Sequence, residues 1–262
     1  MIDFIKKDSY DIKDLARIVS ILRAPGGCPW DGEQTHASLR RGLIEESCEV
    51  IEAINEENPE HLKEELGDLL LQVVFHADIE KDAGRFTLDD VADGICKKLI
   101  FRHPHVFGEV QVSGTDQVLV NWEELKRQEK HQESYTDTLN AVARTLPGLW
   151  RAEKVQNKAK KAGFDWGEYG PAMDKLSEEY LELKKAIEES SNIAEELGDL
   201  LFAAVNVSRF VGVDPEEALN GATEKFISRF AKVEQLARES GRDMAQMGLS
   251  ELEELWEMAK RT

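Results

Sequence analysis

The chain has 262 residues, with 52 acidic residues against 33 basic ones and a formal net charge of −19. At roughly 100 to 200 residues per domain, this length predicts one large domain or two modest ones. The acidic balance argues against a protein built to bind nucleic acid, because such proteins carry clustered lysine and arginine. An anionic substrate would need a metal ion or local basic residues.

The three cysteines are isolated along the chain and form no Cys-x-x-Cys pair, so neither a disulfide framework nor a zinc ribbon is indicated. The first residues lack the apolar core of a signal peptide, and no run approaches the ~18 apolar residues of a membrane span. We therefore expect a cytoplasmic protein without a membrane partner and without nucleic acid as a partner.

Helical periodicity dominates the chain, and no segment shows the alternation of a strand. Apolar residues recur at helical spacing over residues 43–54 and again over 62–77. Between these segments Asn58 suits an N-cap and Pro59 the first helical position, which leaves a short turn over residues 55–58. A connection this short predicts an antiparallel helical hairpin.

Capping signals indicate where two later helices begin. Thr87 with Asp90 resembles a capping box that opens a helix running to about Arg102. In the second half of the chain, Asp214 followed by Pro215 predicts another helix start.

An acidic pattern is written twice at helical spacing. Residues three apart share one face of a helix, so two antiparallel helices would pool four carboxylates. Hard divalent cations prefer oxygen ligands and often bridge carboxylates to substrate phosphates. The pattern predicts a Mg²⁺ site for a phosphorylated ligand, with Mn²⁺ as a substitute, in each half. The first copy comprises Glu45, Glu46, Glu49, Glu64, Glu65 and Asp68, and the second comprises Glu178, Glu179, Glu182, Glu195, Glu196 and Asp199.

The repeat extends beyond the acids. Lys98 and Arg102, at positions i and i+4, are matched by Lys225 and Arg229, and Trp122 is matched by Trp256. These cations would bind phosphate oxygens, with arginine able to grip two at once. The order of matched residues predicts two tandem helical domains, residues 1–132 and 137–262.

Together, the EExxE and EELGDLL segments, the CPWD segment and Arg102-His103-Pro104-His105 resemble the MazG family of nucleoside triphosphate pyrophosphohydrolases, over nearly the whole chain. The resemblance implies an all-α fold and the hydrolysis of nucleoside triphosphates to a monophosphate and pyrophosphate, a housekeeping activity on the nucleotide pool.

Carried onto this chain, the resemblance implies Mg²⁺ ligands at Glu179, Glu182, Glu196 and Asp199, triphosphate contacts at Lys225 and Arg229, and a base contact at Trp256. The first half offers Glu46, Glu49, Glu65, Asp68, Lys98, Arg102 and Trp122 in the same roles. The general base stays open among Glu178, Glu195, Glu45 and Glu64. If one half alone is active, we favour the second.

Three other functions remain under comparison. A di-iron bundle is disfavoured, because such sites use Glu-x-x-His and this chain has acids at those positions. A narrower dUTP or phosphoribosyl-ATP pyrophosphohydrolase would share the magnesium motif. A non-catalytic acidic scaffold for protein partners is separated from the enzyme by metal-dependent release of pyrophosphate. We further expect a homodimer whose helices complete each bundle.

Overall fold

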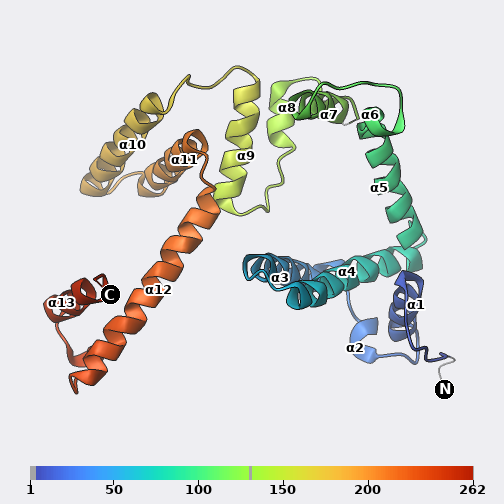
Figure 1. The fold of residues 1–262 in the computed structure, drawn as a ribbon, viewed down its shortest axis with the longest axis horizontal. Coiled ribbons are helices and arrows are strands. Elements are labelled where there is room, and N and C mark those ends of the chain that lie inside the picture. The colour runs from blue at the N-terminus through green and yellow to red at the C-terminus, as the bar shows by residue number, and fades with distance from the viewer. Residues whose placement is uncertain (1–3, 130–131, 262) are drawn as a thin grey trace. The chain divides into compact units, whose positions relative to one another are not determined.

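The computed structural model describes residues 4–129 and 132–261, which form helices joined by turns and no strand (Figure 1). The predicted all-α class is confirmed. The chain divides into two compact units, Met1–Lys126 and Arg127–Thr262. The division falls within helix α7 (Thr115–Glu129), shortly before the boundary predicted at residues 132–137.

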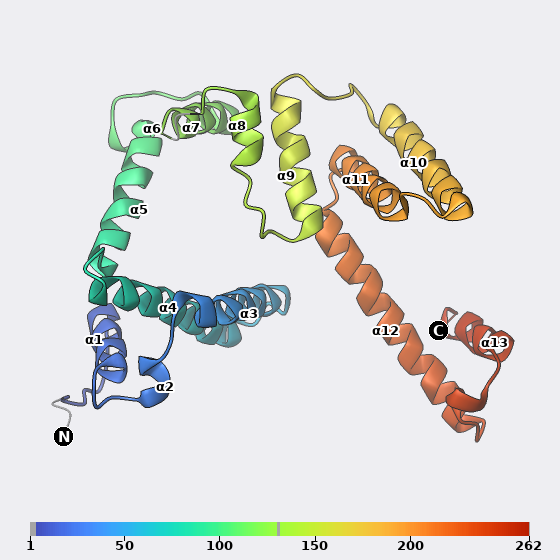
Figure 2. The same cartoon turned by 180° about the vertical axis from the view of Figure 1, so that it is seen from behind.

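Unit 1 is built on the hairpin of α3 and α4, which lie side by side in the views of Figures 1 and 2. The short helix α1 packs against α4, and α5 continues from the end of α4. The helices of this unit before α7 are α1 (Ile12–Arg23), α2 (Pro29–Gly32), α3 (His36–Asn55), α4 (Pro59–Asp82), α5 (Leu88–Arg102) and α6 (Pro104–Phe107).

The predicted helix starts of unit 1 are confirmed. Asn58 caps α4 by accepting a hydrogen bond from the backbone N–H of His61, and Pro59 is the first helical residue. Thr87 and Asp90 form the capping box of α5. Because the turn between α3 and α4 is short, the second helix folds back on the first, which brings their acidic faces together.

A small core holds α1 and α3 against α4. Val19 and Val74 are almost completely buried, and Leu39 and Phe75 complete the cluster. At the end of α1, the Arg23 guanidinium lies 3.5 Å from a carboxylate oxygen of Asp78. Apolar burial and this buried ion pair fix α1 against α4.

Unit 2 repeats the hairpin with α10 and α11, and α9 packs against α11 (Figure 2). Asp214 caps α12 as predicted, and it also accepts a hydrogen bond from the Trp150 indole at 3.0 Å, which ties the start of α9 to the start of α12. The elements are α8 (Tyr135–Asn140), α9 (Gly148–Lys161), α10 (Tyr169–Glu189), α11 (Ile193–Val211), α12 (Pro215–Glu239), the 3-10 turn η1 (Met244–Gln246) and α13 (Leu249–Ala259).

Many large apolar side chains of these hairpins stay exposed within the single chain. Leu66 and Leu70 on α4 are 48% and 40% exposed, and Leu197 and Leu201 on α11 are 46% and 49% exposed.

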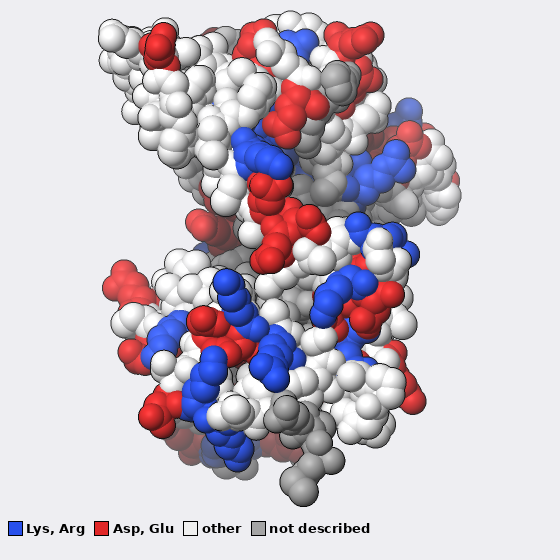
Figure 3. Space-filling view, turned by 90° about the vertical axis from the view of Figure 1, so that its right-hand side faces the viewer, with Lys and Arg blue, Asp and Glu red and all other residues white. Residues whose placement is uncertain are grey.

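On the face drawn in Figure 3, acidic and basic side chains lie interspersed among uncharged surface. Among the helices formed by the described residues, none is both long and apolar enough to cross a membrane.

Candidate metal centre and adjoining cavity

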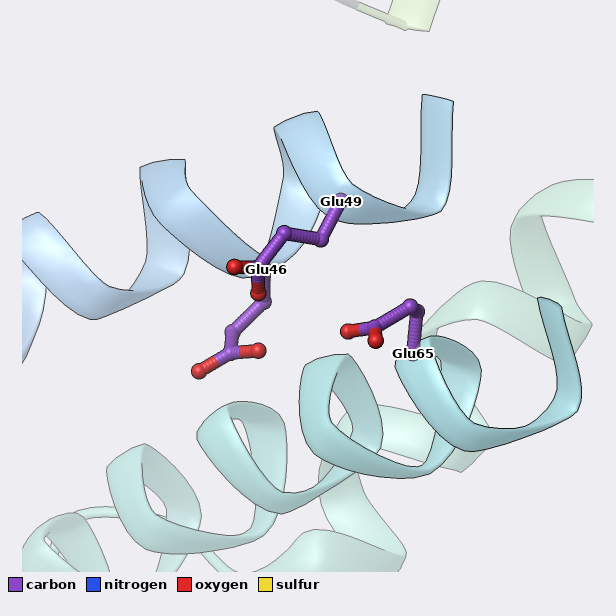
Figure 4. Close-up of side chains that lie close together, drawn as sticks. All are labelled: Glu46, Glu49 and Glu65. Atoms are coloured by element: carbon purple, nitrogen blue, oxygen red, sulfur yellow. The ribbon is translucent and has the colours of Figure 1, made fainter. Parts of the chain in front are cut away.

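Three of the four predicted ligands of unit 1 converge between α3 and α4. Glu46 and Glu49 extend from α3 and Glu65 from α4, with one oxygen of each within 4.8 Å of the others (Figure 4). Asp68 stands one turn farther along α4, outside this group. Burial, and then the negative charges of Asp68 and Glu49, raise the pKa of Glu46. Repulsion among these carboxylates therefore adds to the effect of burial on the Glu46 pKa.

Two side chains, a histidine and a glutamine, contact the carboxylates of this first cluster. The His61 Nε2 lies 3.2 Å from an oxygen of Glu65, and the Gln72 amide donates to Glu46 at 3.5 Å. A hydrogen bond with Glu56 raises the pKa of His61. Neither partner was evident from the acidic motif, although His61 stands four residues before Glu65.

Unit 2 assembles its own cluster from Glu179 on α10 and from Glu196 and Asp199 on α11, again within 4.8 Å. Glu179 is buried, Glu196 is half-buried and Asp199 is exposed. Here Glu182 is the acid outside the group. Burial, and then the charge of Glu179, raise its pKa. Two positions are therefore common to both clusters, because Glu46 matches Glu179 and Glu65 matches Glu196. The third carboxylate differs: it is Glu49 in unit 1 and Asp199 in unit 2.

Lys175 is a charged neighbour of the second cluster that the motif search missed. Its Nζ lies 2.7 Å from an oxygen of Glu179 and 2.7 Å from one of Glu178. These two contacts hold the lysine pKa well above its usual range. Its position four residues before Glu179 on α10 is the sequence signal that would have found it.

The four candidate general bases differ in their surroundings. Glu45 is exposed and pairs with Arg41 at 2.7 Å, and Glu178 is engaged by Lys175. Glu64 lines an open hollow with His61. Glu195 is exposed in the first turn of α11, and among the described residues no ion pair engages it. Among the described residues, Glu195 and Glu64 are therefore the two of the four whose carboxylates are in no ion pair.

The predicted substrate-binding residues lie on other helices than the carboxylates. In unit 1, Lys98 is half-buried on α5, and the buried Arg102 places its guanidinium 5.3 Å from the Trp122 ring centroid. In unit 2, Lys225 and Arg229 lie on α12 and Trp256 packs against Phe226 with ring centroids 5.2 Å apart. A cavity adjoins Glu179 in unit 2, and none of these six residues lines it.

That cavity has a volume of about 370 Å³, is open to solvent on one side, and is lined by α9, α10, α11 and the segment that leads into α10. Glu179 and Asp199 line it together with Lys175, so the cavity opens directly onto the second cluster. Two hollows formed by described residues of unit 1 are lined by none of its three clustered carboxylates. The second cluster therefore has an adjoining space for an organic ligand.

Gly67 and Gly198 lie inside helices, in the two ELGDLL segments, where glycine is less favourable than alanine. A Cβ added at Gly67 or Gly198 would meet no heavy atom within 4 Å. Packing within the single chain therefore does not account for either glycine.

Comparison with known proteins bears on both halves. The family model described as MazG nucleotide pyrophosphohydrolase domain matches residues 34–107 and 171–233, which contain the two clusters. The chain belongs to the MazG nucleotide pyrophosphohydrolase family. Each match begins near the first helix of a hairpin, so the two MazG domains carry one carboxylate centre each.

Curated relatives agree over nearly the whole length. The chain is 45% identical over 248 residues to the nucleoside triphosphate pyrophosphohydrolase/pyrophosphatase MazG of Thermotoga maritima, covering 95% of each chain. It is 42% identical over 255 residues to the nucleoside triphosphate pyrophosphohydrolase of Escherichia coli strain K12, covering 95% of this chain and 97% of that one. The uncharacterized protein YabN of Bacillus subtilis is 46% identical over 256 residues, which span 97% of this chain and 52% of YabN.

Proposed function

We propose that the chain is a nucleoside triphosphate pyrophosphohydrolase and that its second MazG domain hydrolyses NTPs and dNTPs at the α-phosphate, releasing a nucleoside monophosphate and pyrophosphate. The observation that carries the proposal is the cavity of about 370 Å³ that opens onto the clustered Glu179, Glu196 and Asp199. Family membership and the names of the full-length relatives support the same reaction class.

The donor set fits Mg²⁺. Three carboxylates within 4.8 Å of one another offer oxygen ligands alone, which a hard divalent cation prefers, and Mn²⁺ accepts the same set. Glu179, Glu196 and Asp199 would hold the ion, and Glu182, which lies outside this group in the single chain, is the fourth ligand that the resemblance implies. When bound, such an ion supplies Lewis acidity toward phosphoryl oxygens and lowers the pKa of water.

The chain's own residues perform the remaining tasks. Glu195 is our candidate for the general base, because Glu178 is engaged by Lys175 while Glu195 stands exposed next to the ligand Glu196. Lys175 is placed to contact a phosphate oxygen once its carboxylate partners turn to a cation. No covalent enzyme intermediate is required, since an activated water suffices for attack at phosphorus.

The products and the position of attack test the reaction. We expect Mg²⁺-dependent release of pyrophosphate, rather than orthophosphate, from ATP, GTP, CTP, UTP and the dNTPs. In water enriched with heavy oxygen, attack at the α-phosphorus places the label in the monophosphate, whereas attack at the β-phosphorus places it in pyrophosphate. Turnover confined to dUTP or phosphoribosyl-ATP would replace the broad assignment with the narrower one, and no turnover would favour the acidic scaffold.

A homodimer is part of the proposal. The α10–α11 hairpin exposes Leu181, Leu197 and Leu201, which a monomer would leave in water. Lys225 and Arg229 lie outside the cavity that adjoins the carboxylates of their own unit. We propose that a second copy covers the apolar faces and brings these cations to the site. A single species with the mass of one chain in light scattering would contradict this arrangement.

A further inference from the structure

Two histidines meet at the end of the α3–α4 hairpin that lies opposite its turn. His36 is the first residue of α3, and His76 lies in the last turns of α4. Their rings are stacked with centroids 4.9 Å apart and an interplanar angle of 16°, and the two Nδ1 atoms are 2.7 Å apart. This is the length of a hydrogen bond, so one Nδ1 carries a proton and the other accepts it.

The second nitrogen of His36 is held by a carboxylate. His36 Nε2 lies 2.5 Å from an oxygen of Glu80, which is 8% exposed. Arg85, just beyond the end of α4, donates two hydrogen bonds to the same carboxylate. The bonds from Arg85 and His36 lower the pKa of Glu80 to about 2, so this carboxylate is charged wherever histidine titrates. His36 Nε2 therefore carries a proton, because a charged carboxylate only accepts.

Counting protons shows which charge states the histidine contact permits. When both rings are neutral, the bare Nδ1 of His36 accepts from the Nδ1–H of His76. When one proton is added, His36 becomes the charged ring and donates to Glu80 and to the Nδ1 of His76. A second proton would set two N–H groups and two positive charges against each other at 2.7 Å, which removes the hydrogen bond. The contact therefore survives one charge and fails at two.

The charged groups around the pair do not relieve this repulsion. Among the described residues, Glu80 is the one charged group that contacts either ring, and it is already engaged by Arg85. Burial, and then the charge of His36, lower the pKa of His76. The other charged groups on the elements packed here include Arg17 and Arg23 on α1, the exposed Arg40 and Arg41 on α3, Asp78, Lys81 and Asp82 on α4, and Asp89 and Asp90 on α5. Of these, Arg23 pairs with Asp78 and Asp82, Lys81 with Asp78, and Arg41 with Glu45.

The second unit has no histidine pair at the matching place. In the register that matches Glu65 with Glu196, the position of His76 is occupied by Val207 and that of Glu80 by Val211. Neither valine can titrate. A proton-sensitive contact of this kind is therefore confined to the first unit, and the second hairpin serves as an internal reference.

We propose that His36 and His76 form a pH-sensitive clamp, which holds the start of α3 on α4 while at most one ring is charged and releases it when both are charged. Release loosens the hairpin beside the core residue Leu39, while the short turn still joins the helices at the other end. A histidine whose folded-state pKa is lowered contributes stability that is present above the unfolded value of about 6.5 and is lost as pH falls through the folded value. Acid therefore opens the first hairpin and spares the second.

Amide hydrogen exchange of the full chain, followed by mass spectrometry, measures how often the start of α3 opens. We compare exchange at about pH 7.5 and about pH 5.5, on either side of the ordinary histidine pKa, after correction for the intrinsic pH dependence of exchange. The opening equilibrium at the start of α3 should increase roughly tenfold at the lower pH, the change that corresponds to one pKa unit. The start of α10, in the unit without the pair, should change little.

His76→Asn is the decisive variant, because the asparagine amide can still donate to the Nδ1 of His36 and never becomes charged. It should keep the hairpin closed at both pH values. The matched control is His105→Asn, an identical change in a second pair of histidines, whose rings lie 5.7 Å apart and are tilted by 51°. This control should respond to pH as the wild type does. Equal responses in the wild type and His76→Asn, or a wild type that does not respond, would overturn the clamp.

A measurement on the wild type alone keeps the proposal testable if circular dichroism shows that His76→Asn does not fold. Nitrogen NMR of the imidazole rings follows their charge as pH is lowered. A clamp requires the pair to take up its second proton at a lower pH than its first, because the two rings interact. If both rings become charged together, as independent histidines do, the clamp is ruled out.

Discussion

Lys175 holds Glu179 and Glu178 simultaneously, with its Nζ 2.7 Å from an oxygen of each. In the first domain the matching position, four residues before Glu46, is Gly42. A Cβ added there would lie 3.0 Å from the Gln72 Nε2, so the Gln72 amide occupies this side of the helix. The second cluster is therefore contacted by a full positive charge, and the first by an amide and a histidine. Since an ammonium ion and Mg²⁺ would compete for the same carboxylate, we expect this lysine to weaken Mg²⁺ binding in the second domain.

Replacing Lys175 by Met should tighten Mg²⁺ binding to the nucleotide-free protein by several-fold, because no cation then has to leave Glu179. The metal-free variant should melt at a lower temperature, since its carboxylates repel one another without a counter-charge. Titration of Mg²⁺ followed by calorimetry or thermal melting measures both effects. Lys185→Met, which removes an exposed lysine 4.0 Å from Glu189, is the control. Equal Mg²⁺ affinity in the Lys175 variant and the wild type would refute the competition.

The two carboxylate centres should contribute unequally to turnover. Asp199→Asn removes a ligand that also lines the cavity, so we expect Mg²⁺-dependent activity to fall by roughly a hundredfold or more. Glu46→Gln makes the same isosteric change in the first cluster. The carboxylates of that cluster line neither of the two hollows described in unit 1. That variant should keep most of the activity. The reverse outcome would move the active centre to the first domain.

The sequence predicted the helical hairpins and the convergence of acids because both depend on local spacing. Asn58 and Pro59 fix where α4 begins, and the short turn then forces α3 and α4 together. Which carboxylates come closest was not predictable from spacing alone: Asp68 and Glu182 fall outside their groups, although both follow a ligand by three residues on the same helix. That choice depends on the side-chain directions and the packing angle of the two helices.

The acidic motif could not predict the cavity, for a different reason. Gln156 lies on α9, outside the acidic pattern, and the packing of α9 against α11 brings it to the cavity beside the clustered carboxylates. The Asp165–Arg209 pair likewise joins a loop to a helix 44 residues away. Such long-range pairs leave no periodic signal in a single chain.

Asp165→Asn should destabilise the second domain by about 2 kcal/mol at neutral pH, because it leaves the buried Arg209 guanidinium without its counter-charge. Hydrogen bonds from Arg209 hold the pKa of Asp165 below its ordinary value of 3.8. The stabilisation is therefore complete above the unfolded-state pKa and disappears as pH falls through the lower folded-state pKa. Urea unfolding of both proteins at pH 7 and at several values below pH 4 should show the difference in free energy shrinking with acid. Asp174→Asn, at an exposed position of α10, controls for a lost surface charge. A difference that persists undiminished in acid would show that the ion pair is not its source.

If each site takes its carboxylates from one copy of the chain and its cations from the other, two inactive variants should restore activity when they pair in one dimer. Glu179→Gln inactivates the carboxylate side of a site and Arg229→Ala weakens the cation side, so each variant alone should be largely inactive. In a heterodimer, one site combines both defects while the other takes intact carboxylates from one chain and an intact cation from the other. Random pairing after co-expression makes half of the dimers heterodimers with one good site of two, so activity should recover to about a quarter of the wild-type value. Sites built within one chain would show no recovery, because every chain in the mixture carries a defect. The measurement is pyrophosphate release by the co-purified mixture, with each variant purified alone as its baseline.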